Sequence, residues 1–200
     1  LTEQAQQVTL TSRAFRNDRL ADFYETVTRV LGFEAVIPMN TGAEAVETAI
    51  KLARKWAYRT RGVPENRAEL IVMDGNFHGR TTTIISFSDD ETARADFGPY
   101  SPGFRLADFG DVESLRQAIT PETVAVLLEP IQGEAGIIVP PAGYLREVRE
   151  LTRRNNVLLI CDEVQTGMGR TGTTFRFQAE DIDPDIITVG KALGAGIVPL

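Results

Sequence analysis

The chain has 200 residues, with 28 acidic against 21 basic side chains and a formal net charge of −7. This balance argues against a nucleic-acid surface, which usually carries clustered Lys and Arg. No apolar run reaches the roughly 18 residues that a membrane span requires. The apolar share of 42% is ordinary for a globular protein, and a chain of this length can bury a substantial core.

Cys161 is the single cysteine of the chain and lies inside an apolar run, and His78 is the single histidine. A disulfide within the chain is therefore impossible, and we expect a buried, inert thiol in a cytoplasmic protein. One histidine without a Cys-x-x-Cys pair cannot build a multi-histidine zinc site, so no metal is expected.

The two ends of the sequence suggest a piece of a longer protein. The chain does not start with methionine, and the polar residues 1–11 lack the apolar core of a signal peptide. The last residues, Ile197-Val198-Pro199-Leu200, are apolar and stop in mid-pattern. We expect further structure beyond both ends.

Apolar residues at helical spacing predict helices over residues 18–30, closed by Gly32, and over residues 43–61, closed by Gly62. Two later helices are predicted over residues 111–119 and 143–155. Apolar runs that end in polar residues predict buried strands at 69–73, 123–128, 157–161 and 185–189.

The segment 82–87 is predicted as a strand or the end of a short helix, and 88–104 as irregular. Strands that alternate with helices indicate an α/β fold, with a mostly parallel sheet flanked by helices in a three-layer sandwich. We expect an N-terminal helical segment over residues 1–35 and a large domain over residues 36–200.

Asp162 follows the apolar run 158–161 directly, at the end of a predicted strand. In open α/β sheets, ligands bind outside the carboxyl ends of the strands. Polar or glycine-rich loops follow the predicted strands and should gather at that edge; they span residues 74–80, 129–136, 162–172 and 190–196.

Lys191 comes just after a predicted strand, and the segment Asn40-Thr41-Gly42-Ala43 opens a predicted helix. Partial burial would lower the pKa of such a lysine and make it a Schiff-base candidate, whereas the alternative is a surface lysine on a loop. The unpaired N–H groups of a helix start favour an anion such as phosphate. Taken alone, an ordinary helix cap explains the second segment better.

Together these residues suit pyridoxal phosphate, which needs an amine, an anion for its ring nitrogen, a phosphate site and a ring platform. Lys191, Asp162, the Gly42-Ala43 pair and Phe77 supply the four. The segment 167–172 also matches G-x-G-x-x-G, but a dinucleotide site needs these glycines directly after a strand and at the start of a helix. Because residues 162–166 intervene and 173–177 are β-branched and aromatic, we do not favour a nicotinamide enzyme.

Five segments, in order and spacing, resemble the class III, fold-type-I aminotransferases over nearly the whole chain. They are Met39-Asn40-Thr41-Gly42-Ala43-Glu44-Ala45, Asn76-Phe77-His78-Gly79-Arg80-Thr81, Glu129-Pro130-Ile131-Gln132-Gly133-Glu134, Asp162-Glu163-Val164-Gln165-Thr166-Gly167 and Gly190-Lys191-Ala192-Leu193. Within the class, residues 9–15 and 39–42 are most similar to the ornithine branch, and the acetylornithine branch is the alternative.

The resemblance implies a role for each matching residue. Lys191 would hold the cofactor as a Schiff base, Asp162 would pair with its ring nitrogen, and Gln165 would contact its 3′-oxygen. Phe77 and Val164 would cover the two ring faces, and Arg80 would bind a substrate carboxylate. The implied cofactor-binding set is Thr41, Gly42, Ala43, Phe77, His78, Asp162, Val164, Gln165 and Lys191. Glu134 would lie near the distal group of the substrate, and Glu129 would support Arg80 or the segment 40–42.

The implied reaction moves the δ-amino group of ornithine to 2-oxoglutarate by a ping-pong cycle and gives glutamate semialdehyde and glutamate. The resemblance also implies amino-acid and 2-oxo-acid substrates and a homodimer for the full-length protein. We expect the 200-residue piece alone to be inactive, because segments that complete the family's site are missing from it. A binding or assembly module without enzymatic activity is a remote alternative.

Overall fold

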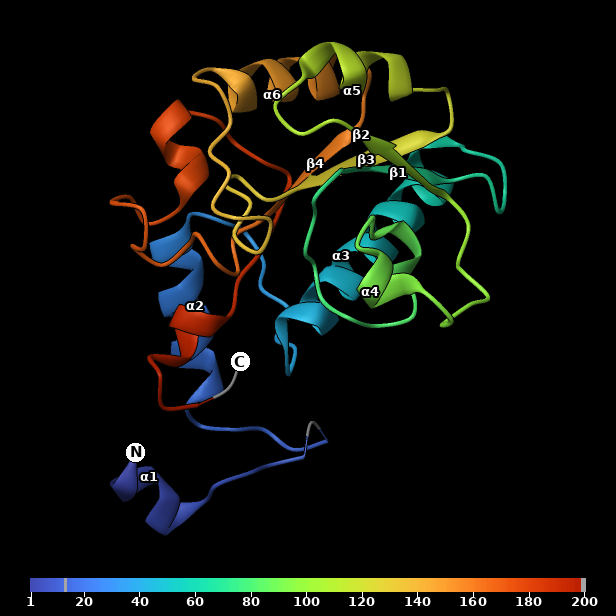
Figure 1. The fold of residues 1–200 in the computed structure, drawn as a ribbon. Helices are drawn as coiled ribbons and strands as arrows, with labels where there is room; N and C mark the ends of the chain where they lie inside the picture. Colours follow the sequence, from blue (N-terminus) through green and yellow to red (C-terminus); the bar gives the residue numbers. More distant parts are fainter. Residues whose placement is uncertain (13, 199–200) are drawn as a thin grey trace. The chain divides into compact units, whose positions relative to one another are not determined.

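The computed structural model describes residues 1–12 and 14–198, so Arg13 of the segment 9–15, and Pro199 and Leu200, lie outside the described residues. The chain forms two compact units, Leu1–Pro38 and Met39–Leu200 (Figure 1). None of the helices within the described residues has both the length and the apolar character needed to cross a membrane.

The first unit contains two helices, α1 (Thr2–Gln7) and α2 (Leu20–Leu31). The predicted end of α2 is confirmed, because Gly32 adopts a left-handed φ of 73° and its N–H bonds to the carbonyl of Thr28 at 2.9 Å. Glycine adopts this conformation without a Cβ penalty, which suits it to end a helix. The sequence did not predict α1.

The second unit is built on a parallel sheet of five strands in the order β2-β1-β3-β4-β5. The strands are β1 (Glu69–Met73), β2 (Phe104–Ala107), β3 (Thr123–Leu128), β4 (Leu158–Asp162) and β5 (Ile186–Thr188). The central strand β3 is buried along its whole length, which explains its unbroken apolar run. The predicted parallel α/β sheet is confirmed.

Strand β2 lies at an edge of the sheet and was missed, because it begins inside the stretch predicted to be irregular. Its Arg105 and Leu106 are exposed, so it lacks the apolar run of a buried strand. The same stretch also contains the short helix α4 (Glu91–Arg94), which Asp90 caps with a hydrogen bond to the N–H of Thr92. For residues 82–87 the helical alternative is correct, as the helix η2 (Ile84–Phe87).

Helices cover both faces of the sheet, as the three-layer prediction requires (Figure 1). Helix α3 (Gly42–Trp56) lies on one face, and α5 (Val112–Ala118) and α6 (Tyr144–Arg154) lie on the other. A π-helical turn, η1 (Ala57–Arg61), extends α3 and ends at Gly62, which has a left-handed φ of 74°. The late helices η3 (Arg176–Glu180) and η4 (Lys191–Gly194) flank β5 in sequence.

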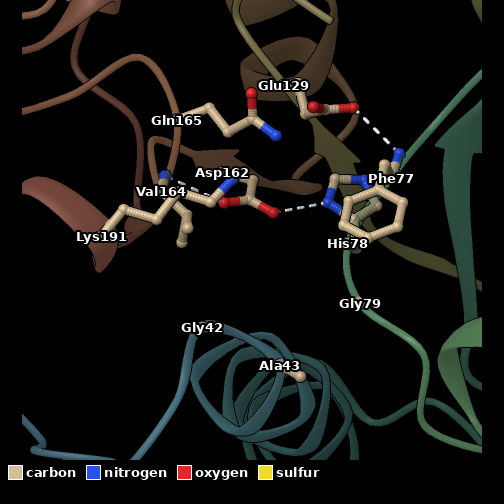
Figure 2. Close-up of a pocket in the computed structure, with 10 residues that line it drawn as sticks. All are labelled: Gly42, Ala43, Phe77, His78, Gly79, Glu129, Asp162, Val164, Gln165 and Lys191. Carbon is tan, nitrogen blue, oxygen red and sulfur yellow. Dashed lines mark hydrogen bonds and ion pairs between the residues drawn. The ribbon is translucent and has the colours of Figure 1, made fainter. Parts of the chain in front are cut away.

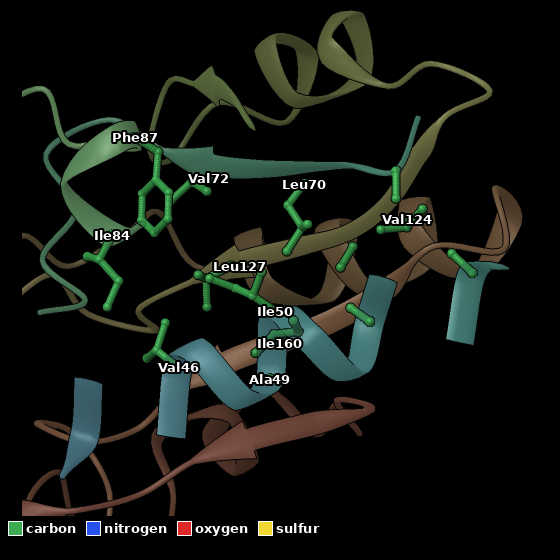
Figure 3. Close-up of a cluster of buried hydrophobic side chains, with 14 of the residues drawn as sticks. Val46, Ala49, Ile50, Leu70, Val72, Ile84, Phe87, Val124, Leu127 and Ile160 are labelled. Atoms are coloured by element: carbon green, nitrogen blue, oxygen red, sulfur yellow. The ribbon is translucent and has the colours of Figure 1, made fainter. Parts of the chain in front are cut away.

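Helix α3 is held to the sheet by its apolar stripe (Figure 3). Val46, Ala49, Ile50 and Ala53 recur at helical spacing and are all buried. They pack with strand residues that include Leu127. Burying one such aliphatic side chain contributes roughly 1.5–3 kcal/mol, so this stripe fixes the position of the start of α3.

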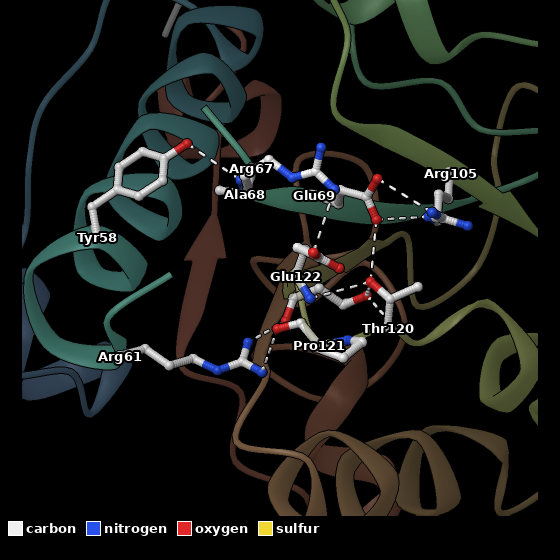
Figure 4. A network of polar contacts seen from close by, with 10 residues as sticks. Tyr58, Arg61, Arg67, Ala68, Glu69, Arg105, Thr120, Pro121 and Glu122 are labelled. Carbon is white, nitrogen blue, oxygen red and sulfur yellow. Dashed lines mark hydrogen bonds and ion pairs between the residues drawn. The ribbon is translucent and has the colours of Figure 1, made fainter. Parts of the chain in front are cut away.

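Polar side chains join the strands at the amino-terminal edge of the sheet (Figure 4). The Glu69 carboxylate accepts hydrogen bonds from Arg105 Nε at 2.7 Å and from Thr120 Oγ1 at 3.2 Å. Arg61 Nη2 donates to the carbonyl of Pro121 at 3.3 Å. These contacts bind β1, β2 and the entry to β3 together, at the edge opposite the strand-end loops.

Candidate cofactor and substrate site

The strand-end loops and the start of α3 line one pocket at the carboxyl edge of the sheet (Figure 2). Its lining residues are Gly42, Ala43, Phe77, His78, Gly79, Glu129, Asp162, Val164, Gln165 and Lys191. The structure thus brings together the residues predicted to bind a cofactor, except that Thr41 is not in the lining. The predicted substrate residues Arg80 and Glu134 also lie outside the lining, each in contact with a residue that belongs to it.

Asp162 is buried at the end of β4, and several neighbours fix its carboxylate. Oδ2 lies 2.6 Å from His78 Nδ1, and Oδ1 accepts hydrogen bonds from Thr188 Oγ1 at 2.9 Å and from the N–H of Val164 at 3.1 Å. His78 is also buried, and a carboxylate acceptor places a proton on its Nδ1. Within residues 1–12 and 14–198, His78 Nε2 is a buried atom without a hydrogen-bond partner.

The start of α3 combines a helix cap with a close approach of loops. Thr41 Oγ1 accepts a hydrogen bond from the N–H of Glu44 at 3.1 Å. Thr41 is therefore an ordinary helix cap, as the alternative interpretation of this segment predicted. A Cβ on Gly42 would lie 3.2 Å from the methyl groups of Val164. Gly79 has φ of +127°, and a Cβ there would lie 2.8 Å from the Cβ of Ala43, so these loops pack closely only with glycine.

Glu129 is buried at the end of β3 and accepts hydrogen bonds from the N–H of Phe77 at 3.0 Å and of Gly133 at 3.4 Å. Desolvation raises the pKa of its carboxyl, while His78 acts in the opposite direction. That Glu129 supports Arg80 or the segment 40–42 stays a prediction. Main-chain N–H groups take its oxygens, whereas Arg80 is exposed, with Cζ 5.3 Å above the Phe77 ring.

Gln165 and Glu134 meet at the pocket's rim. Gln165 Nε2 donates to Glu134 Oε1 at 2.7 Å. A Cβ on Gly133 would lie only 2.1 Å from Gln165 Oε1, so the side chain of Gln165 occupies the space that any other residue at 133 would need. The loop after β3 therefore sets the position of the Gln165 amide.

Lys191 lines the pocket but is exposed, so the expectation of partial burial is wrong. It follows β5, a strand of three residues that pairs with β4 alone among the strands of the described residues. Lys191 has φ of 42°, in the left-handed region that costs a non-glycine residue roughly 1–3 kcal/mol. Such strained residues cluster at functional sites.

Two other expectations concern residues outside the pocket. Cys161 is fully buried, and burial raises the pKa of its thiol well above the usual value, in line with an inert side chain. The glycine-rich segment 167–172 lies in turns between β4 and η3 and opens no α-helix, so its geometry is not that of a dinucleotide loop.

Sequence reasoning missed three positioning contacts of the site. Thr188 binds Asp162 from the next strand, Glu129 holds the main chain of Phe77, and Gly133 makes room for Gln165. A threonine at the end of a strand beside the one that carries Asp162 was the available signal for the first. The other two depend on how the loops pack, for which the sequence carries no periodic signal.

The class-III aminotransferase family model matches residues 1–200, and the chain belongs to this family. Curated ornithine aminotransferases of Brevibacillus brevis and Bacillus subtilis are 58% and 55% identical to the chain over all 200 residues. The chain spans 50% of each, about half the length of these relatives. The resemblance found in the sequence is therefore confirmed.

Solved structures give the same picture of the fold. The ornithine aminotransferase of Toxoplasma gondii superposes with a TM-score of 0.97 at 45% identity, covering 99% of this chain and 47% of that one. The acetylornithine aminotransferase of Elizabethkingia anophelis superposes with a TM-score of 0.85 at 49% identity, covering 99% of this chain and 48% of that one. Both confirm the predicted α/β fold with a parallel sheet flanked by helices.

Proposed function

We propose that this chain supplies the pyridoxal-phosphate site of an ornithine aminotransferase, which moves the δ-amino group of ornithine to 2-oxoglutarate and yields glutamate semialdehyde and glutamate. The observation that carries the proposal is one pocket lined by an amine, a buried carboxylate and an aromatic ring, at the start of a helix: Lys191, Asp162, Phe77 and Gly42. The identity of 54–58% to curated ornithine aminotransferases supports ornithine as the substrate.

The residues present fit this cofactor. The N–H groups of Gly42 and Ala43 lie in the first turn of α3, where N–H groups have no partner within the helix and favour an anion such as phosphate. Gly42 keeps that approach open next to Val164, since a Cβ would lie 3.2 Å from the methyl groups of Val164. When bound, pyridoxal phosphate supplies an electron sink for the carbon that carries the amino group.

Asp162 would hold the ring nitrogen of the cofactor and stabilise a proton on it. Hydrogen bonds from Thr188 and Val164 to Oδ1, and the His78 contact to Oδ2, fix this carboxylate before any ligand binds. Charge fixed in advance in a site shielded from water is worth more than the same charge in solution.

The remaining residues would bind the cofactor or the substrate, and one of them, Lys191, would also move a proton. Lys191 Nζ would hold the cofactor, and as a free amine it would move a proton at the reacting carbon. Phe77 and Val164 would cover the cofactor ring, Gln165 would donate to or accept from its oxygen substituent, and Arg80 would pair with a substrate carboxylate. Glu134 lies near the distal group of the substrate.

A substrate comparison on the full-length protein tests the proposal. We expect kcat/KM for ornithine to exceed that for N-acetylornithine, and Lys191→Ala to abolish both turnover and the absorbance band of bound pyridoxal phosphate. A higher kcat/KM for N-acetylornithine would replace the ornithine assignment with the acetylornithine one. An unchanged spectrum in Lys191→Ala would remove the role of this lysine.

A further inference from the structure

Glu129 has no part in the proposed chemistry, yet it lines the pocket. It follows the central strand β3 and is only 4% exposed. Its oxygens accept main-chain hydrogen bonds from loops that follow different strands. One comes from Phe77 after β1 (Figure 2), and the other comes from Gly133 after β3. One buried carboxylate therefore joins two strand-end loops, one of which lines the pocket.

The segment that begins at Phe77 carries several site groups in a row. The Phe77 ring lines the pocket, His78 contacts Asp162 at 2.6 Å, and Arg80 lies with Cζ 5.3 Å above the Phe77 ring. The N–H of Phe77 is tied to Glu129 at 3.0 Å. Movement of this anchor would shift the ring platform and, with it, the guanidinium above the ring.

We infer that Glu129 is a positioning residue that acts through the main chain of Phe77, setting the aromatic platform for the cofactor and the placement of Arg80 for the substrate carboxylate. This inference rests on the proposed function. The link from Glu129 to Arg80 runs through Phe77, whose N–H donates to Glu129 and whose ring lies under the Arg80 guanidinium. The alternative is a buried acid that serves folding alone.

The charge of Glu129 provides a sharp probe of this role. A carboxylate accepts on both oxygens, whereas the amide of glutamine accepts on one and turns an NH₂ group towards the other N–H donor. Glu129→Gln therefore keeps the shape and breaks one anchor. Glu180 is a matched control, because it is 7% exposed, accepts a main-chain hydrogen bond from Arg146 at 3.3 Å and does not line the pocket.

The experiment compares wild type, Glu129→Gln and Glu180→Gln in the full-length protein. Three properties are measured: Tm, the visible circular-dichroism band and dissociation constant of pyridoxal phosphate, and kcat and KM for 2-oxoglutarate. We expect Glu129→Gln to weaken cofactor binding and raise KM by about tenfold each, with an altered dichroism band, as loss of one charge-assisted hydrogen bond implies. Glu180→Gln should lower Tm and leave the other properties unchanged.

A lower Tm in Glu129→Gln with an unchanged band, cofactor affinity and KM would overturn the positioning role. If that variant does not fold, Glu129→Asp replaces it, since it keeps the charge but is too short to reach both N–H groups, and the same changes are expected. Wild type that binds no pyridoxal phosphate would overturn the proposed function as well. If wild type binds pyridoxal phosphate and Glu129→Gln binds it equally well with an unchanged KM, only the positioning role is overturned.

Discussion

Asp162 and His78 form a buried pair whose Oδ2 and Nδ1 atoms lie 2.6 Å apart at the carboxyl edge of the sheet. The contact joins the loop after β1 to the end of β4, two strands that are not neighbours in the sheet. It orients a negative charge towards the pocket before any ligand binds.

Asp162→Asn should separate charge from shape. The amide can still accept from Thr188 and Val164, but it is neutral and no longer stabilises a protonated ring nitrogen. We expect turnover to fall by about 100-fold or more, the size of effect that loss of one fixed electrostatic group produces. Single-turnover kinetics with ornithine measure this loss, and turnover within about twofold of wild type would contradict the role of the carboxylate.

Gly133→Ala should displace the side chain of Gln165. The added Cβ would lie 2.1 Å from Gln165 Oε1 and must push that side chain away from Glu134. We expect a loss of about 1 kcal/mol in the free energy of unfolding, at the low end for overpacked sites, because the displaced atoms are the far end of a flexible side chain. Urea denaturation of Gly133→Ala, Gln165→Ala and the double variant measures the coupling. Additive losses would contradict the clash.

Thr41→Ala should remove the cap of α3. The Thr41 hydroxyl accepts the N–H of Glu44 at 3.1 Å, and loss of such a cap costs about 1 kcal/mol. Thr41→Ser keeps the hydroxyl and is the matched control, with little loss expected. Equal unfolding free energies for wild type and Thr41→Ala would show that the cap adds no stability.

Glu163 should make stability fall as pH rises. It is 1% exposed, and desolvation raises the pKa of its carboxyl above the usual 4.5. The folded protein therefore binds a proton more tightly than the unfolded chain, and this contribution to stability, full below pH 4.5, is lost as pH rises through the folded pKa. Glu163→Gln cannot titrate. We therefore expect the unfolding free energy of the variant, relative to that of wild type, to increase as pH rises. If the difference in unfolding free energy between wild type and Glu163→Gln stays constant as pH rises above 4.5, the pKa of Glu163 is not raised.

Much of the sheet was predictable because its inner strands are buried on both faces. The runs at 69–73 and 123–128 predicted β1 and β3 with the bounds that the structure shows. Strand β2 was not predicted, since an edge strand with exposed Arg105 needs no apolar run. Sequence patterns indicate buried strands and the period of a helix well, but they indicate the edge strands of a sheet poorly.

The members of the site were predictable, and their contacts were not. Asp162 and Lys191 follow strands and so had to reach the same edge of a parallel sheet. The exposure of Lys191 and the partners of Glu129 depend on which strand ends the sheet and how loops pack. Neither feature can be predicted from residue spacing or composition.

The assignment of Lys191 as the residue that holds the cofactor is tested most directly by covalent trapping. The full-length protein is mixed with pyridoxal phosphate, reduced with borohydride, digested and mapped by mass spectrometry. We predict that one peptide carries the added mass of the reduced cofactor and that fragmentation places it on Lys191. Modification of Lys51 or Lys55 alone, with Lys191 unmodified, would contradict the assignment.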